Sequence, residues 1–295
     1  MKGLAALIRL IVFSNIFISG CVLCFTAKTA LILFGNNGNI HVNLLAFFST
    51  IFLYNFHGLF NFMRSHATGA AENQVSYWNL KHIRIKFSVM VTALLLALSQ
   101  LMYMPLRVCL VLVPVSLLAL GYCIPFIRIG SRLLRLRDIL WLKVFWIAFC
   151  YAWLTTCLPV AYAMPFNNLL QPQVVFIFLR NFLFVFAIAI PFDIRDMETD
   201  LKTGLRTLPL LFGVRGSIFI ALFFLLAFLA SASLQVYFHT ITLPVFFALA
   251  LSTVTTALVI PLASPRKPAL FFPFAIEGSM VLQWALLYAF LYVKL

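Results

Sequence analysis

The most regular pattern in this sequence is a series of long apolar stretches, joined by short connections that carry most of the charged residues. A helix needs about 20 apolar residues to cross the roughly 30 Å hydrocarbon core of a bilayer. Continuous apolarity of this length favours helices, which satisfy their own backbone hydrogen bonds in lipid. We predict nine membrane-spanning helices, at about residues 10–34, 42–63, 85–104, 106–127, 138–163, 173–193, 215–236, 240–262 and 270–292.

Composition supports the same class of protein. Hydrophobic residues make up 64% of the chain, charged residues make up 9%, and the mean hydropathy is +1.08. Soluble domains contain about 25% charged residues, so a water-soluble fold is excluded. We therefore expect an all-α polytopic membrane protein whose residues 1–295 form one domain.

The distribution of Lys and Arg predicts the orientation. These residues precede the first predicted span and follow the second, fourth, sixth and eighth, whereas the connections around 36–41, 164–173 and 237–240 contain none. Short loops rich in Lys and Arg stay in the cytoplasm, so the N-terminus is expected there, in the inner (plasma) membrane. The net charge of +14 is then explained by topology and anionic headgroups. We expect no nucleic-acid partner, and nothing indicates an obligate protein partner.

Four of the seven acidic residues lie within eight positions, at the end of the sixth predicted span. The spacing of Asp193, Asp196 and Asp200 places all three within about 60° of one helical face, whereas Glu198 and Arg195 should turn away. Aligned carboxylates repel one another unless cations are near. Hard oxygen ligands of this kind suit Mg²⁺. The alternative is a solvated acidic helix end, balanced by neighbouring basic residues.

The segment from Phe192 to Gly213 resembles the second aspartate-rich motif of the UbiA superfamily of intramembrane prenyltransferases. Nine helices with motifs at their cytoplasmic ends also match that family. The resemblance implies a helical bundle around a lipid-accessible cavity, in which Mg²⁺ held by aspartates binds the diphosphate of an isoprenoid donor. The allylic C–O bond would ionise, and an electron-rich lipophilic acceptor would capture the carbocation.

By this resemblance, Asp193, Asp196 and Asp200 would be the catalytic metal ligands, while Lys202 and Arg206 would contact phosphate oxygens.

The connection after the fourth predicted span supplies more positive charge. Arg128, Arg132 and Arg135 follow i, i+4, i+7 spacing, and residues 122–128 resemble the Tyr-containing basic segment of the family. We predict Arg128 and Lys143 as the residues here that bind substrate, and Lys143 could point into the bundle. The alternative is an ordinary basic cytoplasmic loop.

The first aspartate-rich motif of the family is degenerate in this chain. It should lie at the cytoplasmic end of the second predicted span, where Asn55 matches the leading asparagine. Phe56, Leu59 and Met63 then occupy the three aspartate positions. A second metal site would therefore lack its carboxylate ligands.

Other polar residues of that span could replace the lost ligands. His57, Asn61 and Arg64 share a helical face through i, i+4, i+7 spacing, and an arginine could meet phosphate directly. The alternative is that His57 and Asn61 make interhelical hydrogen bonds and that Arg64 anchors the helix at the membrane surface. We predict these three residues and Asn55 as substrate-binding.

Glu277 and Arg180 are further ionisable residues within predicted spans. Glu277 would either orient an acceptor or pair with a basic side chain of another helix. Arg180 lies next to Asn181, about 20 Å along the helix from Asp193, and both are expected to be structural.

These features predict a Mg²⁺-dependent prenyltransferase that moves an isoprenoid chain from an allylic diphosphate to a lipophilic acceptor, which would be an aromatic compound, a quinone precursor or a lipid. The leading alternative is a non-catalytic or transport member of the family that binds a lipid diphosphate or a cation. A carboxylate-based ion transporter is disfavoured, because the sixth span lacks a chain of ionisable groups crossing the membrane.

Overall fold

A computed structural model describes residues 2–68, 82–129, 132–139, 142–202 and 204–292. Nine helices in these ranges are long and apolar enough to cross a membrane, which confirms the predicted all-α architecture. They are α2 (Ile16–Phe34), α3 (Ile40–Thr68), α5 (Ile83–Leu101), α6 (Leu106–Cys123), α7 (Leu142–Ala163), α8 (Pro172–Lys202), α9 (Leu208–Tyr237), α10 (Leu243–Val259), and α11 (Gly278–Tyr292) with the π-helical turn Phe272–Glu277 before it.

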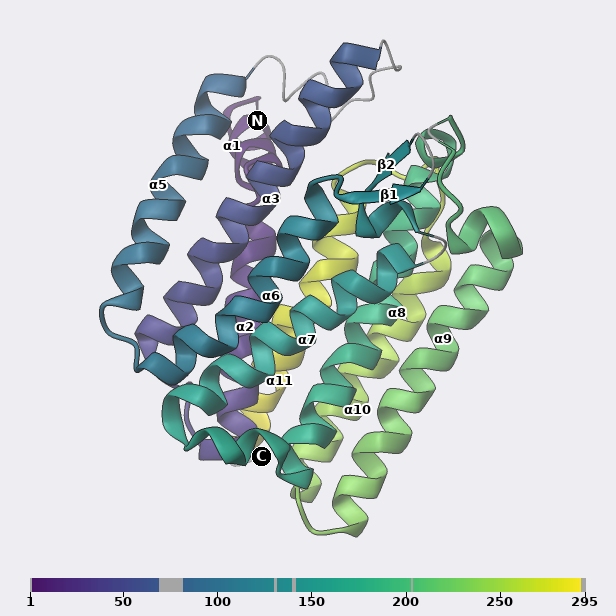
Figure 1. The fold of residues 1–295 in the computed structure, drawn as a ribbon. Helices are drawn as coiled ribbons and strands as arrows, with labels where there is room; N and C mark the ends of the chain where they lie inside the picture. The colour runs from purple at the N-terminus through teal and green to yellow at the C-terminus, as the bar shows by residue number, and fades with distance from the viewer. Residues whose placement is uncertain (1, 69–81, 130–131, 140–141, 203, 293–295) are drawn as a thin grey trace.

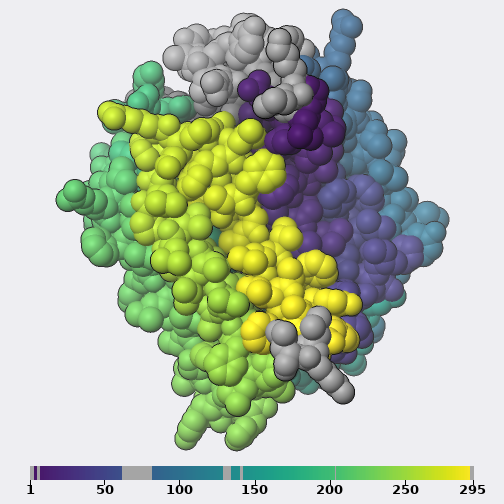
Figure 2. Space-filling model, turned by 180° about the vertical axis from the view of Figure 1, so that it is seen from behind, coloured from purple at the N-terminus to yellow at the C-terminus, as the bar shows by residue number. Residues whose placement is uncertain are grey.

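The helices run side by side between two ends of the bundle, with the chain termini at opposite ends (Figure 1). One end carries a short hairpin of β1 (Ile127–Ile129) and β2 (Arg132–Leu134), followed by the 3₁₀ helix η1 (Leu136–Asp138). We call it the hairpin end. Most neighbours in sequence pack together, and α11 returns to pack against α2. Figure 2 shows this seam from behind, where the C-terminal segment lies against the N-terminal one.

The first predicted span is divided in two. Helix α1 (Lys2–Phe13) ends before α2 begins, and Asn15 between them has a left-handed backbone conformation with φ of 65°. Asparagine tolerates this region because its short side chain can bond locally. The sixth predicted span is longer than expected, since α8 continues helically through Lys202 and includes the whole acidic segment.

The hairpin is the main departure from the predicted elements. The i, i+4, i+7 spacing of Arg128, Arg132 and Arg135 assumes a helix, but these residues lie on β1, on β2 and just before η1. Residues on antiparallel strands do not share a helical face, so the helical spacing does not apply to these three residues.

The outer faces of the helices are apolar, as contact with lipid requires. On α9, Phe219, Phe223 and Leu226 follow i, i+4, i+7 spacing and are 72%, 65% and 65% exposed. A continuous apolar surface of this kind would make a soluble protein aggregate, whereas it suits a surface that faces acyl chains.

A buried polar network joins five helices in the bundle interior. Lys28 Nζ on α2 donates to Asn181 Oδ1 on α8 and to Gln283 Oε1 on α11, each at 2.7 Å. Asn181 Nδ2 donates to Thr156 Oγ1 on α7 at 2.9 Å, and Gln283 Nε2 donates to Ser252 Oγ on α10 at 3.2 Å. Nearby, Arg180 Nη1 donates to Gln235 Oε1 on α9. Arg180 and Asn181 therefore make interhelical hydrogen bonds, as a structural role requires.

We predict that Asn181→Leu destabilises the bundle by about 1–3 kcal/mol, because it removes one acceptor of a fully buried Lys28. The midpoint of thermal unfolding in detergent should fall. The double variant Lys28→Met with Asn181→Leu should lose less than the single variant, since both partners are then apolar. Asn167→Leu, at an exposed position, is the matched control. An unchanged midpoint for Asn181→Leu would contradict the structural role.

Candidate functional site

Two of the predicted carboxylates meet one cation at the hairpin end. Asp193 Oδ1 and Asp200 Oδ2 lie 2.8 Å and 3.0 Å from Nζ of Lys143. The two aspartates are seven residues apart on α8, so they lie two turns apart on one face. Lys143 begins α7, which packs against α8, and all three residues are buried. The group forms a buried ion cluster with two acids and one base.

The third predicted carboxylate has a cation of its own. Asp196 accepts hydrogen bonds from Nε and Nη2 of Arg195 at 2.7 Å and 2.9 Å, and both side chains are about one-third exposed. Helical periodicity directs Arg195 away from the acidic face, but its long side chain bends back to its neighbour. The guanidinium also lies over the rings of Phe192 and Phe272, at 5.0 Å and 5.4 Å.

The polar residues of α3 bind arginines of the connection before α7. His57 Nε2 lies 2.7 Å from Arg137 Nη1, and Asn61 Oδ1 accepts from Arg135 Nη1 at 2.7 Å. Arg135 is itself paired with Asp138 at 2.8 Å. Burial opposes ionisation of Asp138, but hydrogen bonds from Arg135 outweigh it and hold the pKa of that carboxyl below its ordinary value. Two arginines are thus fixed between α3 and α7.

Arg137 interacts electrostatically with the acidic residues of the site. Burial alone would lower the pKa of its guanidinium, but attraction to Tyr122, Asp200, Asp138 and Asp193 outweighs burial and raises that pKa. Its carbon Cζ lies 5.5 Å from the ring centre of Tyr122, and its Nε is buried with no hydrogen-bond partner among the described residues. The residue therefore stays cationic with unused hydrogen-bonding capacity. Sequence reasoning did not single it out among the basic residues of this connection.

Asn55 lies on a different side of α3. Its amide donates to the backbone oxygens of Ser14 and Ile51 at 2.9 Å and 2.8 Å, and it accepts from Asn15. These contacts tie α3 to the break between α1 and α2, so the structure gives Asn55 an interhelical role.

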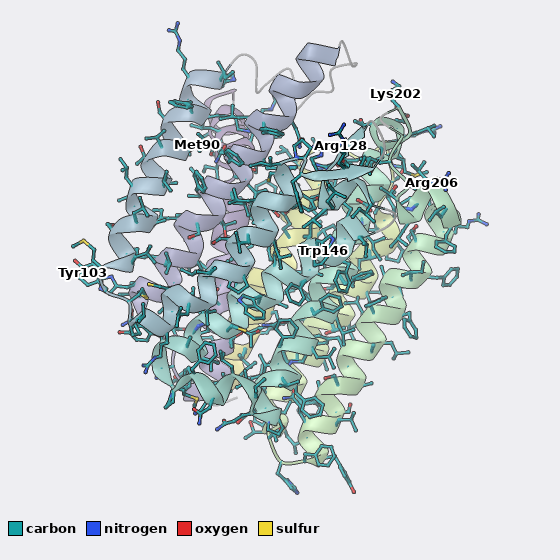
Figure 3. All side chains as sticks on the ribbon, viewed as in Figure 1. Met90, Tyr103, Arg128, Trp146, Lys202 and Arg206 are labelled. Carbon is teal, nitrogen blue, oxygen red and sulfur yellow. The ribbon has the colours of Figure 1, made fainter. Side chains whose placement is uncertain are left out.

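The remaining predicted phosphate contacts lie at the rim. Arg128, Lys202 and Arg206 are exposed at the hairpin end, and Lys202 points away from the helices (Figure 3). The side chains of Arg64 and Arg132 lie outside the described residues. Of the predicted substrate-binding residues, Asn61 and His57 contact each other at 2.7 Å, and Lys143 contacts Asp193 and Asp200.

The carboxylate pair can be tested for its fit to a metal ion. One ammonium nitrogen already lies between two carboxylate oxygens, and Mg²⁺ commonly takes one or two carboxylates and completes its shell with water and phosphate oxygens. Asp193 and Asp200 therefore fit one Mg²⁺. Within the described parts of the chain, no three acidic, His or Cys side chains converge as a metal site, so Asp196 is not brought to this pair.

Solved structures with a similar fold share little sequence identity with this chain. A UbiA homolog from Archaeoglobus fulgidus bound to GPP and Mg²⁺ has a TM-score of 0.64 and 14% identity, with 95% of this chain and 99% of that one covered. A UbiA homolog from Aeropyrum pernix K1 has a TM-score of 0.61 and 15% identity, covering 94% and 97%. A digeranylgeranylglyceryl phosphate synthase has a TM-score of 0.56 and 16% identity, covering 99% and 98%.

No curated protein matches the sequence. The family model of the UbiA prenyltransferase family, however, matches residues 71–287, which include α5 to α10 and nearly all of the acidic and basic groups described above. Together with the nine apolar helices, this match shows that the chain is an integral, multi-pass membrane protein that belongs to the UbiA prenyltransferase family.

Proposed function

We propose that this protein is a Mg²⁺-dependent intramembrane prenyltransferase that moves an isoprenoid chain from an allylic diphosphate to a lipophilic acceptor. One observation carries the proposal: Asp193 and Asp200 share the ammonium of Lys143, and they also attract the guanidinium of Arg137 electrostatically. Membership of the family supports the transferase class. The homolog bound to GPP and Mg²⁺ supports the donor class and the metal. The distribution of Lys and Arg supports a cytoplasmic position for the hairpin end.

The buried ion cluster is suited to hold a metal and a diphosphate together. Asp193 and Asp200 would hold one Mg²⁺, which when bound would neutralise charge on the leaving diphosphate. Lys143, released from the carboxylates, would bind a phosphate oxygen as a point charge. Asp196 as a third ligand stays a prediction, because it would first have to leave Arg195.

The arginines of the connection before α7 would do the electrostatic work of a second metal. Helix α3 lacks the carboxylates for such a metal, and its His57 and Asn61 contact Arg137 and Arg135 instead. A guanidinium presents a planar fork of donors that matches two phosphate oxygens. Arg137 is attracted electrostatically to Asp193 and Asp200, and its Nε has no hydrogen-bond partner among the described residues. Of the arginines in this connection, it is therefore the one best suited to bind the diphosphate. The sequence alone suggested that Arg64 meets the phosphate in place of the missing metal. In this proposal, Arg137 in the connection before α7 makes that contact instead.

The second candidate function is a family member that binds a lipid diphosphate without transferring its chain. The degenerate segment of α3 favours it, because the donor would have fewer metal ions to stabilise its leaving group. Binding and turnover, measured separately, distinguish the two functions.

Purified protein in lipid nanodiscs, given Mg²⁺ and allylic diphosphates of increasing length, should release pyrophosphate and form a prenylated product with an aromatic, quinone-precursor or lipid acceptor. Asp193→Asn and Asp200→Asn should each lower the rate roughly 100-fold, the usual cost of losing one electrostatic stabiliser. Glu198→Gln, an exposed acid on α8, is the control and should leave the rate unchanged. Donor binding without pyrophosphate release would support the non-catalytic function instead.

Lys143→Met should lower the free energy of unfolding by about 3–5 kcal/mol, because two buried carboxylates lose their shared cation. Millimolar Mg²⁺ should recover part of this loss in the variant and add less to the wild type. Thermal unfolding in detergent, with and without Mg²⁺, measures both effects. Lys202→Met, at an exposed position on the same face of the membrane, is the control. A variant that Mg²⁺ does not stabilise would argue against a cation site at this pair.

Arg137→Met should weaken binding of the non-reactive donor geranyl thiodiphosphate by about 10-fold to 100-fold, as expected for the loss of a buried charge-assisted contact. Isothermal titration calorimetry in the presence of Mg²⁺ provides the affinity. Arg215→Met removes an exposed arginine from α9 and should change it little. If Arg128→Met weakens binding and Arg137→Met does not, the exposed hairpin and not the buried arginine binds the diphosphate.

A further inference from the structure

Arg180 is a fully buried cation that the proposed donor site does not use. It lies on α8, 13 residues before Asp193, which corresponds to about 20 Å along the helix. A guanidinium stays charged in proteins, and a charge inside a membrane span almost always has a partner. Among the described residues, however, no carboxylate pairs with Arg180. Its Nη1 donates to Oε1 of Gln235 on α9, which is a neutral amide.

The groups around this guanidinium leave several donors unused. Nε and Nη2 of Arg180, Nε2 of Gln235 and the hydroxyl of Ser231 are buried without a hydrogen-bond partner among the described residues. Ser231 shares one face of α9 with Phe228 and Gln235, through i, i+3, i+7 spacing. The ring centre of Phe228 lies 5.9 Å from Cζ of Arg180, so the residues on both sides of Ser231 contact the guanidinium. Unpaired donors are costly to bury, so this group calls for an acceptor.

The chemistry of these donors favours an anion. The three nitrogen atoms can only donate, and a serine hydroxyl can donate as well. Lys28 brings a second basic group nearby, since its Nζ donates to Asn181, the neighbour of Arg180 in sequence, and to Gln283. Both of these acceptors are neutral amides, and no described carboxylate pairs with Lys28. An anion would supply the missing negative charge and accept from the unused donors.

The donors are enclosed, yet they lie near the end of the bundle opposite the hairpin end. Arg180 and Gln235 are 0% exposed and Ser231 is 6% exposed, so protein surrounds an occupant, which has to be small. Gln235 is two residues from the end of α9, and its backbone oxygen accepts from N and Oγ1 of Thr240 in the turn before α10. An ion from the water on that side therefore has a short path to the site.

We infer that Arg180, Gln235 and Ser231 bind a chloride-sized monovalent anion between α8 and α9. Arg180 supplies the positive charge through Nε and Nη2, while Gln235 and Ser231 donate hydrogen bonds from α9. A ligand that binds only the folded bundle stabilises it, and this effect saturates when the site is full. The site is separate from the proposed donor site and does not depend on prenyl transfer.

Thermal unfolding of the full-length protein in detergent tests for the anion. At constant ionic strength, replacing sodium gluconate with sodium chloride should raise the midpoint by about 3 °C and should saturate as a single site does. Gluconate is the reference anion because it is too large for an enclosed site, whereas bromide should act as chloride does. Equal midpoints in chloride and gluconate, or a rise that does not saturate, would overturn the inference.

Variants assign the chloride effect to these residues. Gln235→Glu places a carboxylate beside Arg180, so its midpoint in gluconate should rise and its response to chloride should disappear. Ser231→Ala should raise the chloride concentration that gives half of the effect about 10-fold, as the loss of one hydrogen bond to a charged group predicts. It also serves as the second variant if Gln235→Glu unfolds. Ser233→Ala, at an exposed position on the same helix, should respond as the wild type does. An unchanged chloride response in folded Gln235→Glu or Ser231→Ala would contradict the site.

Discussion

The site depends on the ammonium of Lys143, held between two carboxylates in a mainly apolar bundle. Each of these three charges would be very costly to bury alone, and together they still leave one negative charge in excess. The positive charge of Arg137, which is attracted to Asp193 and Asp200, balances that excess. The cluster holds the ends of α7 and α8 together.

In the proposed function, the connection before α7 would take the place of the acidic segment expected on α3. A helix that carries carboxylates recruits metal ions, whereas His57 and Asn61 recruit guanidinium groups. Both arrangements bring positive charge opposite the acids of α8. The difference lies in where that charge belongs: a metal ion arrives with the substrate, whereas Arg135 and Arg137 are part of the protein. A site built in this way is partly preorganised before any ligand binds.

Helical periodicity predicted much of the fold and part of the site. Apolar stretches of spanning length indicated the helices, and a spacing of seven residues correctly placed Asp193 and Asp200 on one face, because α8 is continuous there. The same reasoning missed contacts that depend on flexible side chains or on loop conformation. The side chain of Arg195 bends back to Asp196. The position of Arg137 depends on the path of the hairpin and η1, which residue spacing does not predict.

The seam between α2 and α11 has a consequence for how the chain assembles. Lys28 precedes one of its two acceptors, Gln283, by 255 residues in the sequence. Until the last helix enters the bilayer, the amino group lacks one of its final partners. The buried amino group on α2 therefore gains its full set of partners only when α11 docks.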